Sequence, residues 1–184
     1  AAPALVLGST QPEAVVDRRA CEATGVAVVR RRSGGGAVLL RPGEVTWIDL
    51  VVPRDDPLWN DDVGRSMWWV GELWARALVR VGCGAAVVHD GPLVSTDWSR
   101  LVCFDGLGPG EVTLGAAKAV GISQRRTATW ARFQCAVYHR HDPADLVGLL
   151  QPPRPEPGEL RPVAVIEDQR GLVAAVIDEL RLLA

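Results

Sequence analysis

At 184 residues, with 48% of them hydrophobic and a formal net charge of -2, the chain has the size and composition of one globular domain. The near-neutral charge argues against the broadly basic surface of a protein that binds nucleic acid or anionic membranes, and no apolar run approaches the length of a membrane span. We therefore expect a single domain over residues 1–184, located in the cytoplasm, with no nucleic-acid or membrane partner.

Apolar and β-branched runs predict four strands in the first half of the chain, at residues 4–7, 26–30, 37–40 and 45–52. The first run begins almost at the start of the sequence, and we expect further residues upstream of it. Pro12 and Gly25 bound a predicted helix over residues 13–23, because proline suits a first helical turn and glycine a helix end. Residues 45–52 are mostly apolar, so we expect this strand in the centre of a sheet.

The strongest predicted helix covers residues 62–80, where apolar residues recur at helical spacing and Asn60 or Asp61 provides a cap. Five short strands are predicted after it, at residues 85–88, 101–104, 111–114, 119–122 and 132–138. A helix, a proline-rich connector, a strand and a last helix follow, at residues 143–150, 151–162, 163–166 and 171–183. This order contains hairpins, and it predicts an α/β (α+β) fold in which helices flank a mixed β-sheet, not a doubly wound parallel sheet.

The four cysteines are widely spaced, at Cys21, Cys83, Cys103 and Cys135. None belongs to a CxxC pair, and a chain of this size does not need disulfides. We expect free thiols in a reducing compartment and no metal site. Each cysteine is by default a small, buried, apolar side chain.

Lys118 is the only lysine, among many arginines. A lysine can lose its proton when it is desolvated, whereas an arginine keeps its charge. Two short strands are expected on either side of Lys118, which places it in a hairpin turn from which its ammonium can reach a phosphate or carbonyl oxygen. An incidental surface lysine is equally compatible with composition alone.

A glycine run, Gly34–Gly36, follows three arginines and Ser33 between two predicted strands. Glycine lets the backbone approach a ligand closely, and an arginine such as Arg31 can bind a carboxylate or phosphate with two hydrogen bonds. The run is neither a Walker A loop nor a GxGxxG turn. Taken alone, it is also compatible with a flexible hairpin.

Cys103 is predicted to end the strand at residues 101–104. An ammonium beside a cysteine favours the thiolate, which is the nucleophilic form. If the strand that carries Cys103 lies next to the hairpin of Lys118, the two side chains can meet. Without that contact, a buried core cysteine is the simpler interpretation.

Together these segments resemble the lipoate–protein ligase and octanoyltransferase family, which is related to the biotin–protein ligases. Residues 28–38 resemble the family's VVRRxSGGGAV lipoate-binding loop, and residues 118–124 resemble its KxxGxAQ lysine motif. Residues 8–11 are similar to its GRxQ strand end, with Ser9 in place of the arginine. The resemblance extends from Val6 to about Leu150, with the motifs in the family's order.

The resemblance implies the fold of a biotin/lipoate-ligase catalytic domain and the transfer of a lipoyl or octanoyl group to a lysine. The acceptor would be a carrier protein, either a lipoyl domain or the glycine-cleavage H protein. Octanoyltransferases take the acyl group from acyl carrier protein, or move it between carriers, through a cysteine thioester. Ligases first make an acyl-adenylate from lipoate or octanoate and ATP with Mg²⁺.

Two features favour the octanoyltransferase branch. Cys103-Phe104 resembles the CF nucleophile of one such branch, and residues 44–47 resemble its ELTYS segment. The resemblance therefore implies Lys118 and Cys103 as catalytic residues. The residues it implies for substrate binding are Arg31, Ser33, Gly34, Gly35, Gly36, Gly121 and Ser123.

Two alternatives stay open. In an ATP-dependent lipoate–protein ligase, Lys118 would contact the adenylate phosphate and Cys103 would only be packed. In a non-catalytic homologue, the chain would bind a carrier without turnover. The second alternative follows from Leu40, Cys135 and Ala136, which stand where the family usually has a histidine or its HG pair.

Overall fold

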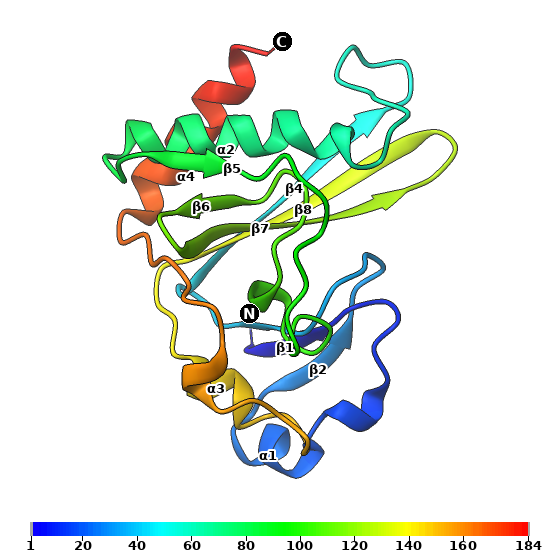
Figure 1. Ribbon diagram of the computed structural model, residues 1–184, viewed down its shortest axis with the longest axis vertical. Helices are drawn as coiled ribbons and strands as arrows, with labels where there is room; N and C mark the ends of the chain where they lie inside the picture. The colour runs from blue at the N-terminus through cyan, green and yellow to red at the C-terminus, as the bar shows by residue number, and fades with distance from the viewer. Residues whose placement is uncertain (1, 184) are drawn as a thin grey trace.

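The computed structural model describes residues 2–183 (Figure 1). Its strands form a three-stranded sheet of order β2-β1-β3 and a five-stranded sheet of order β4-β8-β7-β6-β5. In Figure 1, helix α2 (Trp68–Arg80) lies along the upper face of the large sheet and crosses α4 (Gln169–Arg181), while the small sheet occupies the lower half. The expected α/β fold with flanking helices is confirmed, with two sheets where one was expected.

The small sheet is mixed: β1 (Ala4–Leu7) pairs in parallel with β2 (Ala27–Arg30) and antiparallel to β3 (Val38–Leu40). The apolar side chains of β1 are buried between these neighbours, under helices α1 (Arg18–Ala23) and α3 (Pro143–Val147). A sheet that carries apolar residues on its inner face needs such a cover to exclude water.

The helix expected over residues 13–23 is divided into two pieces. Glu13–Val15 form a short 3-10 turn, and α1 begins only at Arg18. The reason is Asp17, whose carboxylate accepts a hydrogen bond from the Ala20 N–H and so caps a new helix inside the predicted one.

The large sheet is antiparallel throughout, and its strands are β4 (Val45–Pro53), β5 (Ala86–Val88), β6 (Val112–Leu114), β7 (Ala117–Arg126) and β8 (Trp130–Tyr138). Contrary to expectation, β4 is an edge strand that pairs only with β8. Its apolar residues serve two faces: Leu50 and Val52 enter the core, whereas Val51 is 53% exposed. Such alternation of buried and exposed residues is typical of an edge strand with one buried face. A count of apolar residues alone does not distinguish it from a central strand that is buried on both faces.

Helix α2 covers the large sheet with Leu73, Trp74 and Leu78, all fully buried. The helix begins six residues later than predicted, because residues 62–67 form a turn and a 3-10 helix, Arg65–Met67. In that turn the Asp62 carboxylate accepts a hydrogen bond from the Arg65 N–H. The predicted cap at Asn60 or Asp61 is therefore wrong.

Residues 89–111 connect β5 to β6 by running from the large sheet to the small one and back (Figure 1). The strand expected at residues 101–104 is reduced to one bridge, between Val102 and Ala37, and a 3-10 helix follows at Cys103–Asp105. Residues 163–166 likewise form only isolated bridges, from Val163 to Lys118 and from Val165 to Tyr138. Neither segment forms two consecutive residue pairs with one strand, so neither becomes a strand of a sheet.

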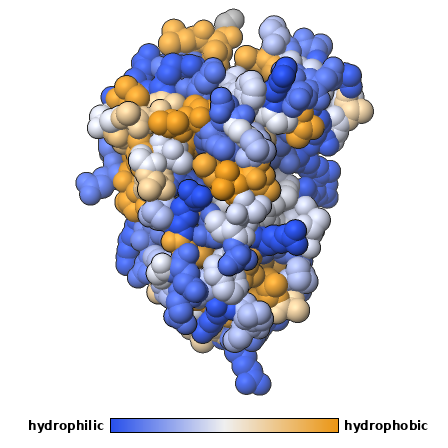
Figure 2. Space-filling model, viewed as in Figure 1, coloured by the Kyte–Doolittle hydropathy of each residue, from blue (hydrophilic) through white to orange (hydrophobic). Residues whose placement is uncertain are grey.

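None of the helices within residues 2–183 is long and apolar enough to cross a membrane. The same residues contain no cluster of three His, Cys, Asp or Glu side chains that could hold a metal ion. On the face shown in Figure 2, apolar residues occur in separate clusters among polar ones.

Candidate functional site

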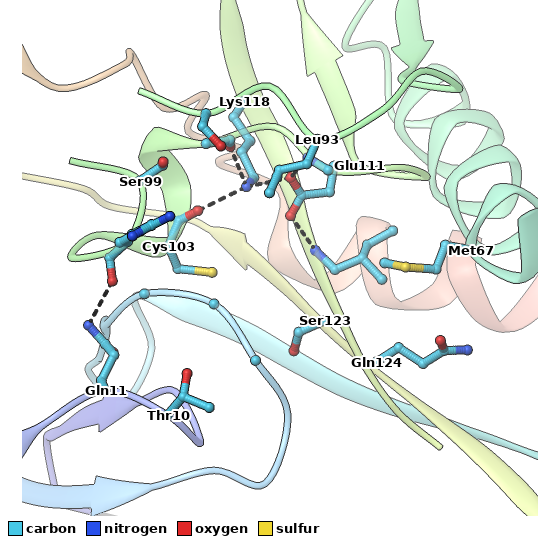
Figure 3. A pocket seen from close by; sticks show the side chains of 18 of the residues that line it. Thr10, Gln11, Met67, Leu93, Ser99, Cys103, Glu111, Lys118, Ser123 and Gln124 are labelled. Carbon is cyan, nitrogen blue, oxygen red and sulfur yellow. Dashed lines mark hydrogen bonds and ion pairs between the residues drawn. The ribbon is translucent and has the colours of Figure 1, made fainter. Parts of the chain in front are cut away.

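A cavity of about 760 Å³ opens between the two sheets, and Figure 3 shows its lining. The glycine run, the connector 89–111 and strand β7 form its walls. Its apolar lining includes Val63, Met67, Leu93 and Ile122. Its volume lies in the range of sites that enclose a small molecule, so it can receive a short acyl chain.

Cys103 lies on the wall of this cavity, at the start of the 3-10 helix. Its sulfur points toward the glycine run (Figure 3), and a Cβ built on Gly35 would lie 3.3 Å from the sulfur. The other cysteines do not line the cavity, and burial raises the pKa of the Cys135 thiol to about 12. Cys103 is therefore the cysteine placed to act as a nucleophile here.

Lys118 is the second residue of β7, and not part of the turn where it was expected; its relative exposure is 1%. Its Nζ forms an ion pair with Glu111 Oε2 at 2.6 Å and donates to the carbonyl oxygens of Cys103 at 3.1 Å and Gly106 at 2.9 Å. An ammonium has three N–H donors, so these three acceptors occupy all of them. Lys118 thus holds the backbone of the turn that carries Cys103 (Figure 3).

Glu111 is a buried member of the site that the sequence did not indicate. Besides the Lys118 ammonium, its carboxylate accepts hydrogen bonds from the N–H groups of Ile122 at 3.0 Å and Gly108 at 2.6 Å. A carboxylate can accept about four hydrogen bonds, so these three contacts leave the Glu111 carboxylate well satisfied. The one sequence feature that could have indicated Glu111 is its position, one residue before the strand that pairs with β7. An acidic residue at this position is also common in an ordinary turn, so the feature does not identify a site residue.

Arg31 is buried beneath the glycine run, at 7% exposure. Its Nη2 donates to the carbonyl oxygens of Gly34 at 2.7 Å and Gly36 at 2.9 Å, and lies 3.8 Å from the Cys103 sulfur. Within residues 2–183 it forms no ion pair with a carboxylate. The sulfur of Cys103 therefore lies beside a buried positive charge that no carboxylate balances.

Two positions of the glycine run, Gly35 and Gly36, require glycine. A Cβ on Gly36 would lie 2.6 Å from the backbone of Val102, and Gly35 has a φ of +96°. No protein acceptor within residues 2–183 receives a hydrogen bond from the N–H groups of Gly34, Gly35 or Gly36. Such free N–H groups can bind an oxygen that gains negative charge.

The two predicted serines meet at the far side of the site. Ser33 Oγ lies 2.9 Å from Ser123 Oγ and donates to Gln134 Oε1 at 2.7 Å, which joins the glycine run to strands β7 and β8. Gly121 lies apart from the cavity: a Cβ there would come within 2.8 Å of the Phe104 ring. The structure thus assembles Lys118, Cys103, Arg31, Ser33, Gly34–Gly36 and Ser123, and leaves Gly121 to packing.

Gln11 connects the loop after β1 to the connector. Its amide nitrogen donates to the carbonyl oxygens of Arg100 and Leu101, both at 3.1 Å, and its amide oxygen accepts from the Gly8 N–H at 2.9 Å. The segment that resembles a strand end in the family therefore fixes one side of the cavity.

Residues 1–176 match the family model of the lipoyl protein ligase A/B catalytic domain. The octanoyltransferase LipM of Moorella thermoacetica is 30% identical over 125 residues, which are 67% of this chain and 45% of that protein. The chain therefore spans less than half the length of this curated relative.

Two solved structures show the same fold. A lipoate-protein ligase A bound with ATP aligns with a TM-score of 0.74 at 19% identity, over 98% of this chain and 68% of that one. A bi-partite lipoate protein ligase from Thermoplasma acidophilum, studied with its E2 lipoyl domain, aligns with a TM-score of 0.72 at 19% identity, over 98% of this chain and 67% of that one. Since the family model matches nearly the whole chain and the fold agrees with it, this protein belongs to the lipoyl protein ligase A/B catalytic domain family.

Proposed function

We propose that this protein transfers a lipoyl or octanoyl group to a lysine of a lipoyl-carrier protein through a thioester on Cys103. One observation carries the proposal: the Cys103 sulfur lies on the wall of an apolar-lined cavity, 3.8 Å from the buried Arg31 guanidinium. The 30% identity to an octanoyltransferase supports it. The acceptor would be a lipoyl domain or the glycine-cleavage H protein, and acyl carrier protein would be the donor.

The nucleophile in this proposal is the Cys103 sulfur, which reacts as a thiolate and lies 3.8 Å from Arg31 Nη2. A buried guanidinium without a carboxylate favours a negative charge nearby, and the Cys103 sulfur is the nucleophile within its reach. Lys118 is less suited to this task, because Glu111 already balances its charge.

In the first step, the thiolate attacks the thioester carbonyl of the donor. The new carbon–sulfur bond forms at Cys103, the donor's carbon–sulfur bond breaks, and the donor leaves as a thiolate that takes a proton from water. In the second step, the carrier lysine's neutral amine attacks the Cys103 thioester, an amide forms, the Cys103 thiolate leaves, and the nitrogen loses its extra proton to water. In each step the free N–H groups of Gly34–Gly36 can stabilise the oxyanion.

Lys118 acts in this proposal as a positioning residue. Its contacts to the carbonyl oxygens of Cys103 and Gly106 hold the turn in place, which keeps the sulfur against the glycine run. It would bind the acyl carbonyl directly only if one of its three present contacts opened.

An ATP-dependent ligase is the second candidate, favoured by the likeness to a ligase bound with ATP. ATP with Mg²⁺ would then activate lipoate or octanoate as an acyl-adenylate, and Lys118 would contact its phosphate. That contact would also require Lys118 to give up an acceptor it now holds.

Intact-mass analysis tests the first candidate. We expect octanoyl-charged acyl carrier protein to add one octanoyl group to the protein, and no group to the Cys103→Ala variant. Cys83→Ala is the matched control, because Cys83 is half-buried and does not line the cavity, and it should be acylated normally.

The other outcomes identify the alternatives. Acyl-adenylate formation from lipoate and ATP that persists in Cys103→Ala would favour the ligase. A carrier that binds but is never acylated, with either donor, would favour the non-catalytic homologue.

A further inference from the structure

A second hollow, of about 640 Å³, opens where strands β2 and β7 end. We call it the arginine groove, and its lining residues are Arg30, Arg31, Arg32, Arg125 and Arg126 with Ser9 and Gln124. No acidic side chain lines it. In a chain of net charge -2, this is a local concentration of positive charge that the composition did not indicate.

Some of these arginines serve the fold. Arg30 donates to the carbonyl oxygens of Gly8 and Gln11, and Arg126 to that of Asp61 at 3.0 Å. The side chains of Arg32 and Arg125 differ: within residues 2–183 neither guanidinium forms an ion pair or donates a hydrogen bond, although that of Arg125 lies over the Trp130 ring, 5.7 Å from its centroid. Two guanidinium groups at the groove therefore remain available to a partner.

The arginine groove adjoins the cavity that contains Cys103. Gln124 lines both hollows, and Ser123 precedes it on β7 as part of the cavity wall. Arg31 lines the groove and also reaches the Cys103 sulfur. A protein seated on the groove could therefore extend an acyl-bearing group to Cys103.

We propose that the arginine groove is the docking surface for the donor, an acyl carrier protein that presents an acidic face around its acyl-bearing group. The inference rests on the proposed function, because transfer through Cys103 requires the donor to bring its acyl group to this sulfur. Guanidinium groups suit this role, since each can bind a carboxylate with two parallel hydrogen bonds.

The test uses the double variant Arg32→Glu/Arg125→Glu and measures acylation of Cys103 from octanoyl-charged acyl carrier protein. We expect kcat/KM to fall by about tenfold or more at low ionic strength, and its salt dependence to weaken. With the small donor octanoyl-N-acetylcysteamine, which has no acidic face, kcat/KM should be unchanged.

The matched control is Arg19→Glu/Arg170→Glu, which makes the same change of charge on helices α1 and α4. Both residues are exposed and neither lines the groove, so acylation from either donor should be unaffected. Equal acylation of the groove variant and the control by the carrier would overturn the inference. A loss with both donors would overturn it too, because the groove would then serve the chemistry and not docking.

Carrier binding, measured by isothermal titration calorimetry, separates this inference from the proposed function. If the carrier binds, and the groove variant alone loses binding, the docking surface stands even when Cys103 is never acylated. If Cys103 is acylated from the carrier and the groove variant binds it normally, the proposed function stands and the docking surface fails.

Discussion

Lys118 and Glu111 form the most buried ion pair of residues 2–183, with side-chain exposures of 1% and 6%. Both charges are satisfied: the ammonium has two carbonyl acceptors in addition, and the carboxylate has two backbone N–H donors. Removing one partner of such a pair leaves the other charged and desolvated, which costs more than the pair itself contributes.

We therefore expect Lys118→Met to lower the free energy of unfolding by about 3–5 kcal/mol. The double variant Lys118→Met/Glu111→Gln should recover much of this loss, because it leaves no unbalanced charge. Urea unfolding at pH 7 measures both. Acylation of Cys103 in the folded double variant should remain slow, because nothing then holds the carbonyl oxygens of Cys103 and Gly106.

Two results would contradict this account of Lys118. If Lys118→Met is as stable as the unaltered protein, the pair is not buried as described. If the double variant is acylated at the normal rate, Lys118 does not position the turn.

At the scale of elements, the glycine run and the 3-10 helix at Cys103–Asp105 depend on each other. Ala37 connects them: its N–H donates to the Leu101 carbonyl at 2.8 Å and its carbonyl accepts from the Cys103 N–H at 3.0 Å. Gly36, one residue earlier, lies so close to this backbone that no side chain fits. The position of Cys103 is thus set by a backbone contact between segments far apart in the sequence.

The variants Gly36→Ala and Gly34→Ala test this contact. A Cβ at Gly36 would meet the backbone of Val102 and Cys103, and overpacking of this kind costs about 1–3 kcal/mol. A Cβ at Gly34 would meet no atom within 4 Å. We expect Gly36→Ala to lower the thermal midpoint and to slow acylation of Cys103, with Gly34→Ala close to normal in both. Similar behaviour of the two variants would contradict the proposed packing.

At the scale of the whole molecule, the site lies where two sheets meet, so its geometry depends on how the sheets are joined. Tyr138 of β8 provides one such contact, because its hydroxyl donates to the Leu39 carbonyl of β3 at 3.1 Å in the buried interior. Ser33 and Gln134 provide a second one, nearer the cavity.

We expect Tyr138→Phe to destabilise the protein by about 1–3 kcal/mol, because the Leu39 carbonyl would lose a buried donor. Denaturant unfolding measures the change. Thr24→Val is the control: it removes an exposed hydroxyl that bonds only within and next to α1, and it should cost less. An equal cost for both variants would mean that the contact between sheets adds nothing beyond an ordinary hydroxyl bond.

Several features were predictable because their causes are local. The apolar runs of β1, β6 and β8, and the helical spacing in α2, determine elements whose side chains need one buried face. The glycine run and the segment around Lys118 could be matched to a family for the same reason, since the residues stand together in the chain. Their meeting in one site agrees with that match.

Other features were not predictable from the sequence. Residues 101–104 look like a strand, but Val102 forms only one bridge, to Ala37, and a 3-10 helix begins at Cys103. Residues 45–52 look like a central strand, but no strand pairs with their outer edge in the part of the chain described. In both segments the neighbouring parts of the fold, and not the local strand propensity, determine the pairing of the backbone.

The sequence by itself determined the composition of the site: one lysine, a glycine run after arginines, and a cysteine in a family-like context. Only the tertiary structure decided which of their charged groups are paired with each other. Glu111 and Lys118 come together because the start of β6 lies beside β7, and their charges cancel. Arg31 therefore remains as the buried, unbalanced charge at the Cys103 sulfur, since electrostatic interactions depend on distance and burial, which the order of residues does not state.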